Sequence, residues 1–374
     1  MKVLIAPDKF KGSLTAQEVC NALAKGLKKA NSEVEIITRP MADGGDGSLE
    51  VLSHYLDGKT ITVEVEDPLF RPIEASYLLV GTTAYIEMAA ASGLALLKKR
   101  KRDCTQTTSY GTGELILDAI RKGATTIYLF IGGSATNEAG MGIASALGYL
   151  FYSKSGEILV PIGENLQEVA KIDGSFLFFK KEKIDFKVVC DVNNPFYGEN
   201  GAAYVYAPQK GASPQTVKML DRGLHHFAEQ LTAHGYPDVA NVPGAGAAGG
   251  IGGGAIALLE AALVSGITTF LEITALEKAI KNCDLIITGE GNLDAQTEQG
   301  KVISGVCALA KKYDKPVIAV CGDADQKAAH QLNLSKVYTI MERVDSLEVA
   351  IESAAIQLEA IGEQLLQKLS LSNE

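Results

Sequence analysis

The sequence lacks the cysteine spacing of metal-binding and disulfide-rich proteins. Its six cysteines are scattered over 374 residues, with no C-x-x-C pair and no histidine ligand nearby. This pattern excludes a structural zinc site and a small disulfide framework. We expect buried free thiols in a reducing compartment.

Long apolar runs and an excess of positive charge are also absent. No window approaches the ~20 apolar residues of a membrane-spanning helix, and the apolar stretch after Met1 is too short for a signal peptide. The chain carries 35 Lys and Arg against 45 Asp and Glu, a net charge of −10. A nucleic-acid binder needs a basic surface, so the sequence predicts a soluble, cytoplasmic protein with neither a nucleic-acid nor a membrane partner.

The composition is otherwise that of a globular protein, apart from an excess of glycine. Hydrophobic residues make up 47% and charged residues 21%, which excludes disordered and fibrous architectures. The length exceeds one domain of roughly 100–200 residues. The 38 glycines are the surplus, about 10% of the chain against a usual ~7%.

Both ends of the chain alternate short apolar strands with helices. Near the N-terminus we expect a strand at Val3–Ala6, a helix that begins with the capping box Thr15–Glu18, and a strand at Val34–Thr38. Such unalternating strands between helices are typical of a parallel sheet covered on both faces. The C-terminal third repeats the pattern, with strands Asp284–Thr288, Pro316–Val320 and Val337–Ile340 and one long helix, Leu347–Leu369.

The middle of the chain has a different pattern. Residues Thr60–Val80 are rich in strand formers interrupted by two X-Pro turns, which predicts an antiparallel segment. Further strands and helices follow it. We therefore predict an α/β domain built from residues 1–60 and 260–374, interrupted by a mixed α/β domain at residues 61–259.

Glycines cluster in five loops, most of them placed where predicted strands end. Glycine lets successive backbone amides face inward around an anion, and ligands of open α/β sheets bind beyond the carboxyl ends of strands. Each loop alone also fits an ordinary turn; the five together indicate a ligand site. The loops are Ala42–Gly47, Tyr110–Gly113, Gly132–Asn137, Pro243–Gly254 and Thr288–Asp294.

Two common nucleotide-binding motifs are incomplete. Residues Gly244–Gly249 fit G-x-G-x-x-G, but no apolar strand precedes them and no acidic residue stands about twenty positions on. An NAD(P)-dependent oxidoreductase is therefore the weaker alternative. The segment ending in Gly300-Lys301 lacks the first glycine and the Ser/Thr of a Walker loop.

Acidic residues follow the ends of several predicted strands. Carboxylates there can hold Mg²⁺ or accept a proton from an attacking hydroxyl, although each residue alone also fits a turn or a helix cap. Lys11, after the first strand, can meet a phosphate; the five histidines have no recognisable catalytic partner. The acidic residues are Asp8, Asp43, Asp46, Asp191, Glu290 and Asp294.

Nine ordered blocks, from end to end of the chain, resemble the bacterial type of the glycerate kinase family. Two small departures are Glu138, where the family pattern has Asp, and Ile303, where it has Pro. The blocks are Ile5–Asp8 with Lys11 and Ser13, Ala42–Gly47, Glu87–Gly93, Thr107–Ile116, Ile131–Asn137, Cys190–Pro195, Pro208–Ala212, Pro243–Gly250, and Ile287–Gly291 with Asp294, Gln296, Thr297 and Gly300-Lys301.

The resemblance implies ATP-dependent, Mg²⁺-assisted phosphorylation of D-glycerate. It also implies a flavodoxin-like (Rossmann-like) three-layer domain with a parallel sheet, interrupted by a second domain, with the active site in the cleft between the two. The favoured product is 2-phosphoglycerate, with 3-phosphoglycerate as the alternative. A non-catalytic anion-sensing protein is a further alternative, and the oligomeric state stays open.

Roles for individual residues follow as hypotheses from this resemblance. Asp191 and Asp294 are candidates to orient and deprotonate the substrate hydroxyl, and Lys11 to offset the charge of the transferred group. ATP phosphates would contact Gly132, Gly133, Ser134, Asn137, Gly244, Gly246, Gly249, Gly250, Gly289 and Gly291. Glycerate would contact Asp8, Arg71, Ser92, Lys210 and Lys301, and Mg²⁺ would be held by Asp43, Asp46, Asp191 and Glu290.

Overall fold

The chain forms two compact units. The computed structural model describes residues 1–45, 47–293 and 302–371. Unit 1 comprises Met1–Asp43, Glu50–Tyr55 and Ser265–Glu374, and unit 2 comprises Gly44–Leu49 and Leu56–Val264. The domain boundaries expected from the sequence, after residues 60 and 259, fall near the outer limits of unit 2.

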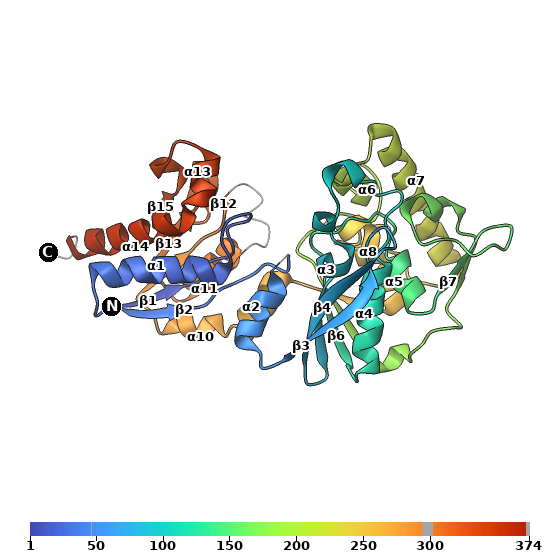
Figure 1. The fold of residues 1–374 in the computed structure, drawn as a ribbon, viewed down its shortest axis with the longest axis horizontal. Coiled ribbons are helices and arrows are strands. Elements are labelled where there is room, and N and C mark those ends of the chain that lie inside the picture. The colour runs from blue at the N-terminus through green and yellow to red at the C-terminus, as the bar shows by residue number, and fades with distance from the viewer. Residues whose placement is uncertain (46, 294–301, 372–374) are drawn as a thin grey trace. The chain divides into compact units, whose positions relative to one another are not determined.

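Unit 1 is built on a five-stranded parallel sheet (Figure 1). The strands lie in the order β15-β13-β11-β1-β2. If the five strands are numbered along the chain, their order across the sheet is 2-1-3-4-5, which is the flavodoxin-like order. The sequence order reverses between β1 and β11, which makes the carboxyl ends of these two strands the switch point of the sheet. The bounds are β1 Lys2–Ile5, β2 Glu35–Thr38, β11 Leu285–Thr288, β13 Val317–Cys321 and β15 Lys336–Thr339.

Helices cover both faces of this sheet. On one face, α1 (Ala16–Ala30) packs beside α14 (Ala354–Leu371), and their apolar residues share a core with Ile318 and Val320 of β13. On the other face, α11 (Val302–Lys312) and α12 (Gln326–Gln331) pack with the alternate β13 residues. This arrangement confirms the predicted three-layer α/β fold with a parallel sheet.

The packing of α1 on α14 depends on two glycines. A Cβ atom at Gly26 would lie 1.9 Å from the carbonyl oxygen of Glu359, and one at Gly362 would lie 2.7 Å from that of Leu23. The two helices therefore approach more closely than side chains would permit. Lys25 adds an ion pair with Glu359 at 2.7 Å.

The predicted start of α1 is confirmed, whereas the predicted long C-terminal helix is wrong. Thr15 and Glu18 form the reciprocal capping box. The segment expected as one helix is instead α13 (Leu347–Glu352) followed by α14. At the break, the hydroxyl and the backbone amide of Ser353 both donate to the carbonyl oxygen of Val349, at 2.6 Å and 2.9 Å, so the side chain shares an acceptor of the helix backbone.

Unit 2 is built on a six-stranded mixed sheet (Figure 1), in the order β10-β9-β6-β5-β4-β3. Strands β3, β4 and β5 pair antiparallel, which confirms the antiparallel segment expected at Thr60–Val80. Strands β5, β6, β9 and β10 pair parallel, so their carboxyl ends share one edge of the sheet. The bounds are β3 Lys59–Glu66, β4 Pro72–Val80, β5 Thr83–Glu87, β6 Thr126–Phe130, β9 Asp185–Val189 and β10 Ala262–Val264.

Helices and a small antiparallel pair, β7 (Leu150–Tyr152) with β8 (Lys171–Asp173), complete unit 2. The helices are α3 Ala89–Ser92, α4 Tyr110–Arg121, α5 Met141–Ala146, α6 Ala202–Tyr206, α7 Pro214–Ala233 and α8 Ala247–Leu259. Unit 1 adds α9 Gly266–Ile273, α10 Leu276–Lys281, β12 Asn292–Leu293 and β14 Asp323–Ala324; α2 Ser48–Tyr55 begins in unit 2 and ends in unit 1.

The glycine tract is not the simple loop at a strand end that the sequence suggested. Most of it belongs to α8, which has left-handed backbone at Ala248, Gly249 and Gly250. Glycine adopts this conformation without the strain that a side chain adds. No helix in the described part of the chain has the length and apolar character needed to cross a bilayer.

Candidate active site

In unit 1, the loops after β1 and β11 meet at the switch point of the sheet. The backbone amide of Asp8 donates to the carbonyl oxygen of Gly289 at 2.8 Å. Just before this pair, the hydroxyl of Thr288 donates to the carbonyl oxygen of Ala6, also at 2.8 Å. A Cβ atom at Gly289 would lie 1.9 Å from the carbonyl oxygen of Val320, so only glycine fits there. These contacts hold the two strand ends at the place where flavodoxin-like sheets bind ligands.

Carboxylates gather at this switch point. Asp8 is 8% exposed and Glu290 is 6% exposed, both strongly buried for acidic residues. Burial raises the pKa of Asp8 to about 8; the charges of Asp43 and, to a smaller extent, Glu290 act in the same direction. A hydrogen bond from the amide of Lys9 at 2.7 Å opposes the shift. The carboxylates therefore repel one another, a condition that a bound cation would relieve.

The fit of this cluster to Mg²⁺ is partial. In the described ranges, no three acidic, histidine or cysteine side chains converge closely enough to form a metal cage. Mg²⁺ usually keeps several waters and takes one or two protein carboxylates, so Asp43 and Glu290 suit it in number and chemistry. Asp46, Asp294 and Lys301, which the sequence analysis also assigned to the site, lie outside the described residues.

Lys11 and Gly291 lie on the same two loops. A Cβ atom at Gly291 would lie 3.3 Å from the backbone nitrogen of Lys11, so the loops approach each other here as well. The Lys11 residue is exposed. The structure thus brings Asp8, Lys11, Gly289, Glu290 and Gly291 together at one edge of the unit 1 sheet.

In unit 2, the loop Gly132–Glu138 follows β6 and is held from several sides. The amide of Ala135 donates to the carbonyl oxygen of Ser92 at 2.9 Å, and the hydroxyl of Thr107 donates to the carbonyl oxygen of Ala135 at 2.9 Å. The amide of Leu94 donates to the carbonyl oxygen of Gly133 at 2.8 Å. The predicted substrate residue Ser92 therefore supports this loop through its backbone.

A lysine supports the same loop from the interior. Lys210 is 2% exposed, and its ammonium donates to the Ser134 hydroxyl at 2.6 Å and to the Thr136 carbonyl oxygen at 2.7 Å. Burial lowers the pKa of Lys210 to about 8, while Cys104 and Glu138 shift it the other way.

Polar groups of the loop are buried without a protein partner. Within the described residues, the side-chain hydroxyl of Thr136 and both side-chain amide atoms of Asn137 make no hydrogen bond. The backbone amides of Ser134, Thr136 and Asn137 donate to no backbone carbonyl there either. A buried, unpaired polar group costs about 1–3 kcal/mol, so such a concentration marks a place where a ligand supplies partners.

The glycine tract packs directly on this loop. A Cβ atom at Gly249 would lie 2.1 Å from the carbonyl oxygen of Thr136, and the carbonyl oxygen of Gly249 accepts from the amide of Ala139 at 3.0 Å. Gly250 approaches Ala139, and a Cβ atom at Gly246 would lie 2.1 Å from the carbonyl oxygen of Pro195. These glycines permit close backbone packing. Their direct contact with phosphate, and that of Gly244, stays a prediction.

Asp191 and Arg71 occupy different places in unit 2. Asp191 lies two residues beyond the end of β9, at the sheet edge that also carries the Gly132–Glu138 loop. Arg71 lies in the turn between β3 and β4, where its guanidinium Nε donates to Asp67 at 2.7 Å. Strand β9 pairs directly with β6, which places Asp191 next to the loop, whereas the turn that carries Arg71 lies farther along the same edge and accepts from the amide of Thr108 at 3.0 Å. A contact between either residue and glycerate stays a prediction.

The sequence analysis missed Glu138 as a functional candidate and noted it only as a departure from the family pattern. Its side chain is fully buried, accepts from the Ser109 hydroxyl at 2.8 Å and accepts from the amide of Gly142. Burial raises the pKa of Glu138 to about 7 despite these hydrogen bonds. Its position after the glycine loop was the only available signal.

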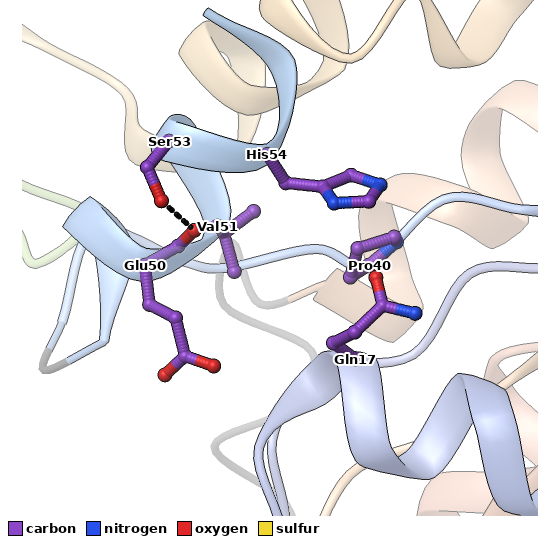
Figure 2. A pocket seen from close by; sticks show the side chains of 6 residues that line it. All are labelled: Gln17, Pro40, Glu50, Val51, Ser53 and His54. Atoms are coloured by element: carbon purple, nitrogen blue, oxygen red, sulfur yellow. Dashed lines mark hydrogen bonds between the residues drawn. The ribbon is translucent and has the colours of Figure 1, made fainter. Parts of the chain in front are cut away.

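A pocket of about 300 Å³ lies elsewhere in unit 1 (Figure 2). His54 faces Pro40 and Gln17 across it, whereas the Glu50 carboxylate points away from His54. The hydroxyl of Ser53 donates to the carbonyl oxygen of Glu50 at 2.7 Å, so its hydrogen bond is made within α2. The pocket contains none of the residues that the sequence analysis selected.

The fold is that of a kinase of the glycerate kinase family, to which this chain belongs. The family's sequence pattern matches residues 3–370. The chain is 42% identical to a glycerate kinase of Halalkalibacterium halodurans over 96% of this chain and 95% of that protein. It is also 42% identical to glycerate 2-kinase of Escherichia coli over 95% of this chain and 94% of that protein.

A solved structure agrees with the sequence comparisons. The crystal structure of a Salmonella typhimurium LT2 protein described as glycerate kinase 2 superposes with a TM-score of 0.86 at 38% sequence identity. The match covers 100% of this chain and 99% of that one. The predicted family, the α/β fold class and the enzyme class are thereby confirmed.

Proposed function

We propose that this protein transfers the γ-phosphoryl group of ATP to the 2-hydroxyl of D-glycerate, giving 2-phosphoglycerate. The family supports phosphorylation of glycerate, and the 42% identity to the E. coli glycerate 2-kinase supports the 2-position. The observation that carries the proposal is the loop Gly132–Glu138, which combines a buried ammonium with backbone amides that donate to no backbone carbonyl of the described residues. This chemistry suits a phosphate chain.

The residues of unit 2 would bind and orient ATP. The amides of Ser134, Thr136 and Asn137 would donate to phosphate oxygens, which lowers the free energy of the negative charge that spreads over the transferring group. Gly249 and Gly250 would act by letting the backbone of α8 lie against this loop. Asp191, at the same sheet edge, would accept the proton of the substrate hydroxyl; Asp294 is the second candidate for this role.

The residues of unit 1 would hold the cation. Asp43 and Glu290 are the described unit 1 residues suited to Mg²⁺, mostly through water. Asp46 and Asp191 are further candidates from outside unit 1. When bound, Mg²⁺ would neutralise part of the negative charge that develops on the transferring phosphoryl group. Lys11 would add positive charge at the same edge. Glycerate would be recognised by Asp8, Arg71, Ser92 and Lys301. A cytoplasmic location and the absence of nucleic-acid or membrane partners also stay predictions.

The test is a coupled assay of ADP release with and without D-glycerate, followed by phosphorus NMR of the product. The proposal predicts ADP release that requires D-glycerate and Mg²⁺, and a resonance split by the proton on C2. A resonance coupled to the C3 methylene protons would identify 3-phosphoglycerate and reject the 2-position. ADP release that is indifferent to glycerate would reject the kinase assignment itself.

An NAD(P)-dependent oxidoreductase finds no support in the fold. The G-x-G-x-x-G segment Gly244–Gly249 leads into α8, and no described strand lies between β9 and this helix. The dinucleotide motif needs a strand immediately before its first glycine. Unchanged nicotinamide fluorescence on mixing with the protein is the expected result.

A further inference from the structure

The position of Lys210 follows from the turn that carries it. The short helical turn Pro208–Lys210 ends at Gly211, whose backbone is left-handed with φ 97°. A Cβ atom at Gly211 would lie 2.0 Å from the carbonyl oxygen of Arg102, so glycine lets this turn pack against the Arg102 backbone. The lysine that precedes it enters the interior of unit 2 and not the solvent.

Packing alone does not account for a lysine at this position. A methionine of similar length would fill the same space without the free-energy cost of removing an ammonium from water. The ammonium makes two hydrogen bonds, and both partners belong to the Gly132–Glu138 loop. The chemistry of Lys210 is therefore directed at the loop.

The direction of these hydrogen bonds determines which donors of the loop remain for a ligand. An ammonium only donates, so the Ser134 oxygen must accept from Lys210, and the single hydroxyl proton of Ser134 is directed to another acceptor. The carbonyl of Thr136 is likewise engaged by Lys210, which fixes the orientation of the peptide plane that contains the Asn137 amide. This amide and those of Ser134 and Thr136 donate to no backbone carbonyl of the described chain.

We infer that Lys210 is a positioning residue for the nucleotide: it holds the Gly132–Glu138 loop so that the Ser134 hydroxyl and the loop amides donate to the phosphate chain of ATP. The inference rests on the proposed function in naming ATP as the anion. It assigns Lys210 an indirect role, in contrast to the direct contact with the substrate carboxylate expected from the sequence.

A consequence in pH separates this role from simple packing. Burial lowers the pKa of Lys210 to about 8, with Cys104 and Glu138 as the titratable groups that act on it. A neutral amine can accept the Ser134 proton, which removes the hydroxyl donor from the phosphate site. The affinity for ATP therefore falls as the pH rises through about 8. An arginine, which stays protonated, would abolish this alkaline loss.

The experiment compares Lys210→Met, Lys210→Arg and a matched control in the full chain. Tyr149→Phe is the control, because it removes a buried hydrogen bond of similar length, 2.7 Å to the Leu258 carbonyl oxygen, away from the loop. For each protein, KM for ATP, KM for glycerate and kcat are measured from pH 6.5 to 9.5, with the thermal midpoint. Direct ATP binding is measured by calorimetry.

Lys210→Met should raise KM for ATP and the ATP dissociation constant about tenfold, the effect of one lost hydrogen bond to a charged group. KM for glycerate should change less than about threefold, and Tyr149→Phe should shift only the thermal midpoint. If Lys210→Met matched Tyr149→Phe in every kinetic constant, or raised KM for glycerate instead, the inference would be overturned.

Two further arms keep the test decisive. If Lys210→Met does not fold, Ser134→Ala, which keeps the lysine and its bond to Thr136, should weaken ATP binding by a similar factor; unchanged binding would reject the inference. If the wild-type protein shows no glycerate-dependent ADP release, the proposed function fails. The calorimetric comparison of ATP binding then still decides the role of Lys210.

Discussion

The backbone amide of Asp8 donates to the carbonyl oxygen of Gly289 across 2.8 Å and joins two segments that lie 281 residues apart in the chain. This bond closes the switch point of the unit 1 sheet, because it ties the loop after β1 to the loop after β11. The buried carboxylates of Asp8 and Glu290 belong to these two loops. The geometry of the acidic cluster thus depends on backbone contacts as much as on the acidic side chains.

Gly289→Ala should lower the free energy of unfolding by about 1–3 kcal/mol, because the new methyl group overlaps the Val320 carbonyl oxygen. Gly291→Ala is the matched control in the same loop, since its Cβ atom would meet its nearest neighbour at 3.3 Å. Urea unfolding of both variants measures the difference. Equal stability of the two would contradict the close packing described for Gly289.

Asp43→Asn should weaken the apparent affinity for Mg²⁺ by about 10–100-fold, if the carboxylate is a ligand or orients one. The initial rate is measured against the concentration of free Mg²⁺ at saturating ATP. The exposed Asp57 provides the control substitution, Asp57→Asn, which should leave the Mg²⁺ dependence unchanged. A normal Mg²⁺ requirement in Asp43→Asn would remove Asp43 from the metal site.

Glu138→Gln should become more stable relative to the wild type as the pH rises. Burial raises the pKa of Glu138 from 4.5 to about 7, so the folded state binds more protons than the unfolded state between these values. The wild type therefore loses stability as the pH rises from about 4.5 to about 7, by up to about 3 kcal/mol, and a residue that does not titrate avoids this loss. Unfolding at pH 5 and pH 8 tests the sign, with the exposed Glu182→Gln as control.

Asn137→Leu should leave stability unchanged or raise it by about 1 kcal/mol, because the amide that it replaces is buried without a protein partner. The same change should reduce kcat/KM for ATP at least tenfold if this amide serves the nucleotide. Thr107→Val gives the contrast, since it removes a satisfied bond to the Ala135 carbonyl oxygen and should cost about 1–2 kcal/mol. A loss of stability in Asn137→Leu as large as in Thr107→Val would show that the amide is paired in solution.

Arg71→Ala should raise KM for glycerate about tenfold with little change in KM for ATP, if the guanidinium meets the substrate carboxylate. The control is Arg121→Ala, at the exposed end of α4. Since Arg71 also pairs with Asp67 in the turn between β3 and β4, thermal unfolding is measured alongside. A change in stability with an unchanged KM for glycerate would make Arg71 a residue of the turn alone.

Local sequence patterns were sufficient for the five strands of the unit 1 sheet and for the antiparallel segment of unit 2. The run Val3–Ala6 and the capping box Thr15–Glu18 report on contacts within a few residues, and the structure has both where they were expected. The helix expected at Leu347–Leu369 is divided at Ser353, whose backbone has φ −97° and ψ 5°. The amphipathic pattern continues across this residue and does not report its backbone conformation.

The site depends on contacts that no local pattern contains. Lys210 stands between a glutamine and a glycine, and its burial results from a loop 74 residues earlier in the chain. The glycines of α8 were noticed as a possible phosphate loop, but Gly249 and Gly254 lie closest to the backbone of Thr136 and Ala139. The sequence indicated which residues to consider. Only the three-dimensional packing distinguishes a residue that supports the loop from one that binds a ligand.

The pairing of α1 with α14 has a consequence for synthesis on the ribosome. Gly26 cannot meet Glu359 until nearly the whole chain has been made, which at ~5–20 residues per second means a wait of roughly 15–65 s. Unit 2 is almost contiguous in sequence, so it can fold during that interval. The apolar side of the first helix is meanwhile without its final partner. Between the synthesis of α1 and that of α14, the apolar face of α1 is therefore exposed to aggregation.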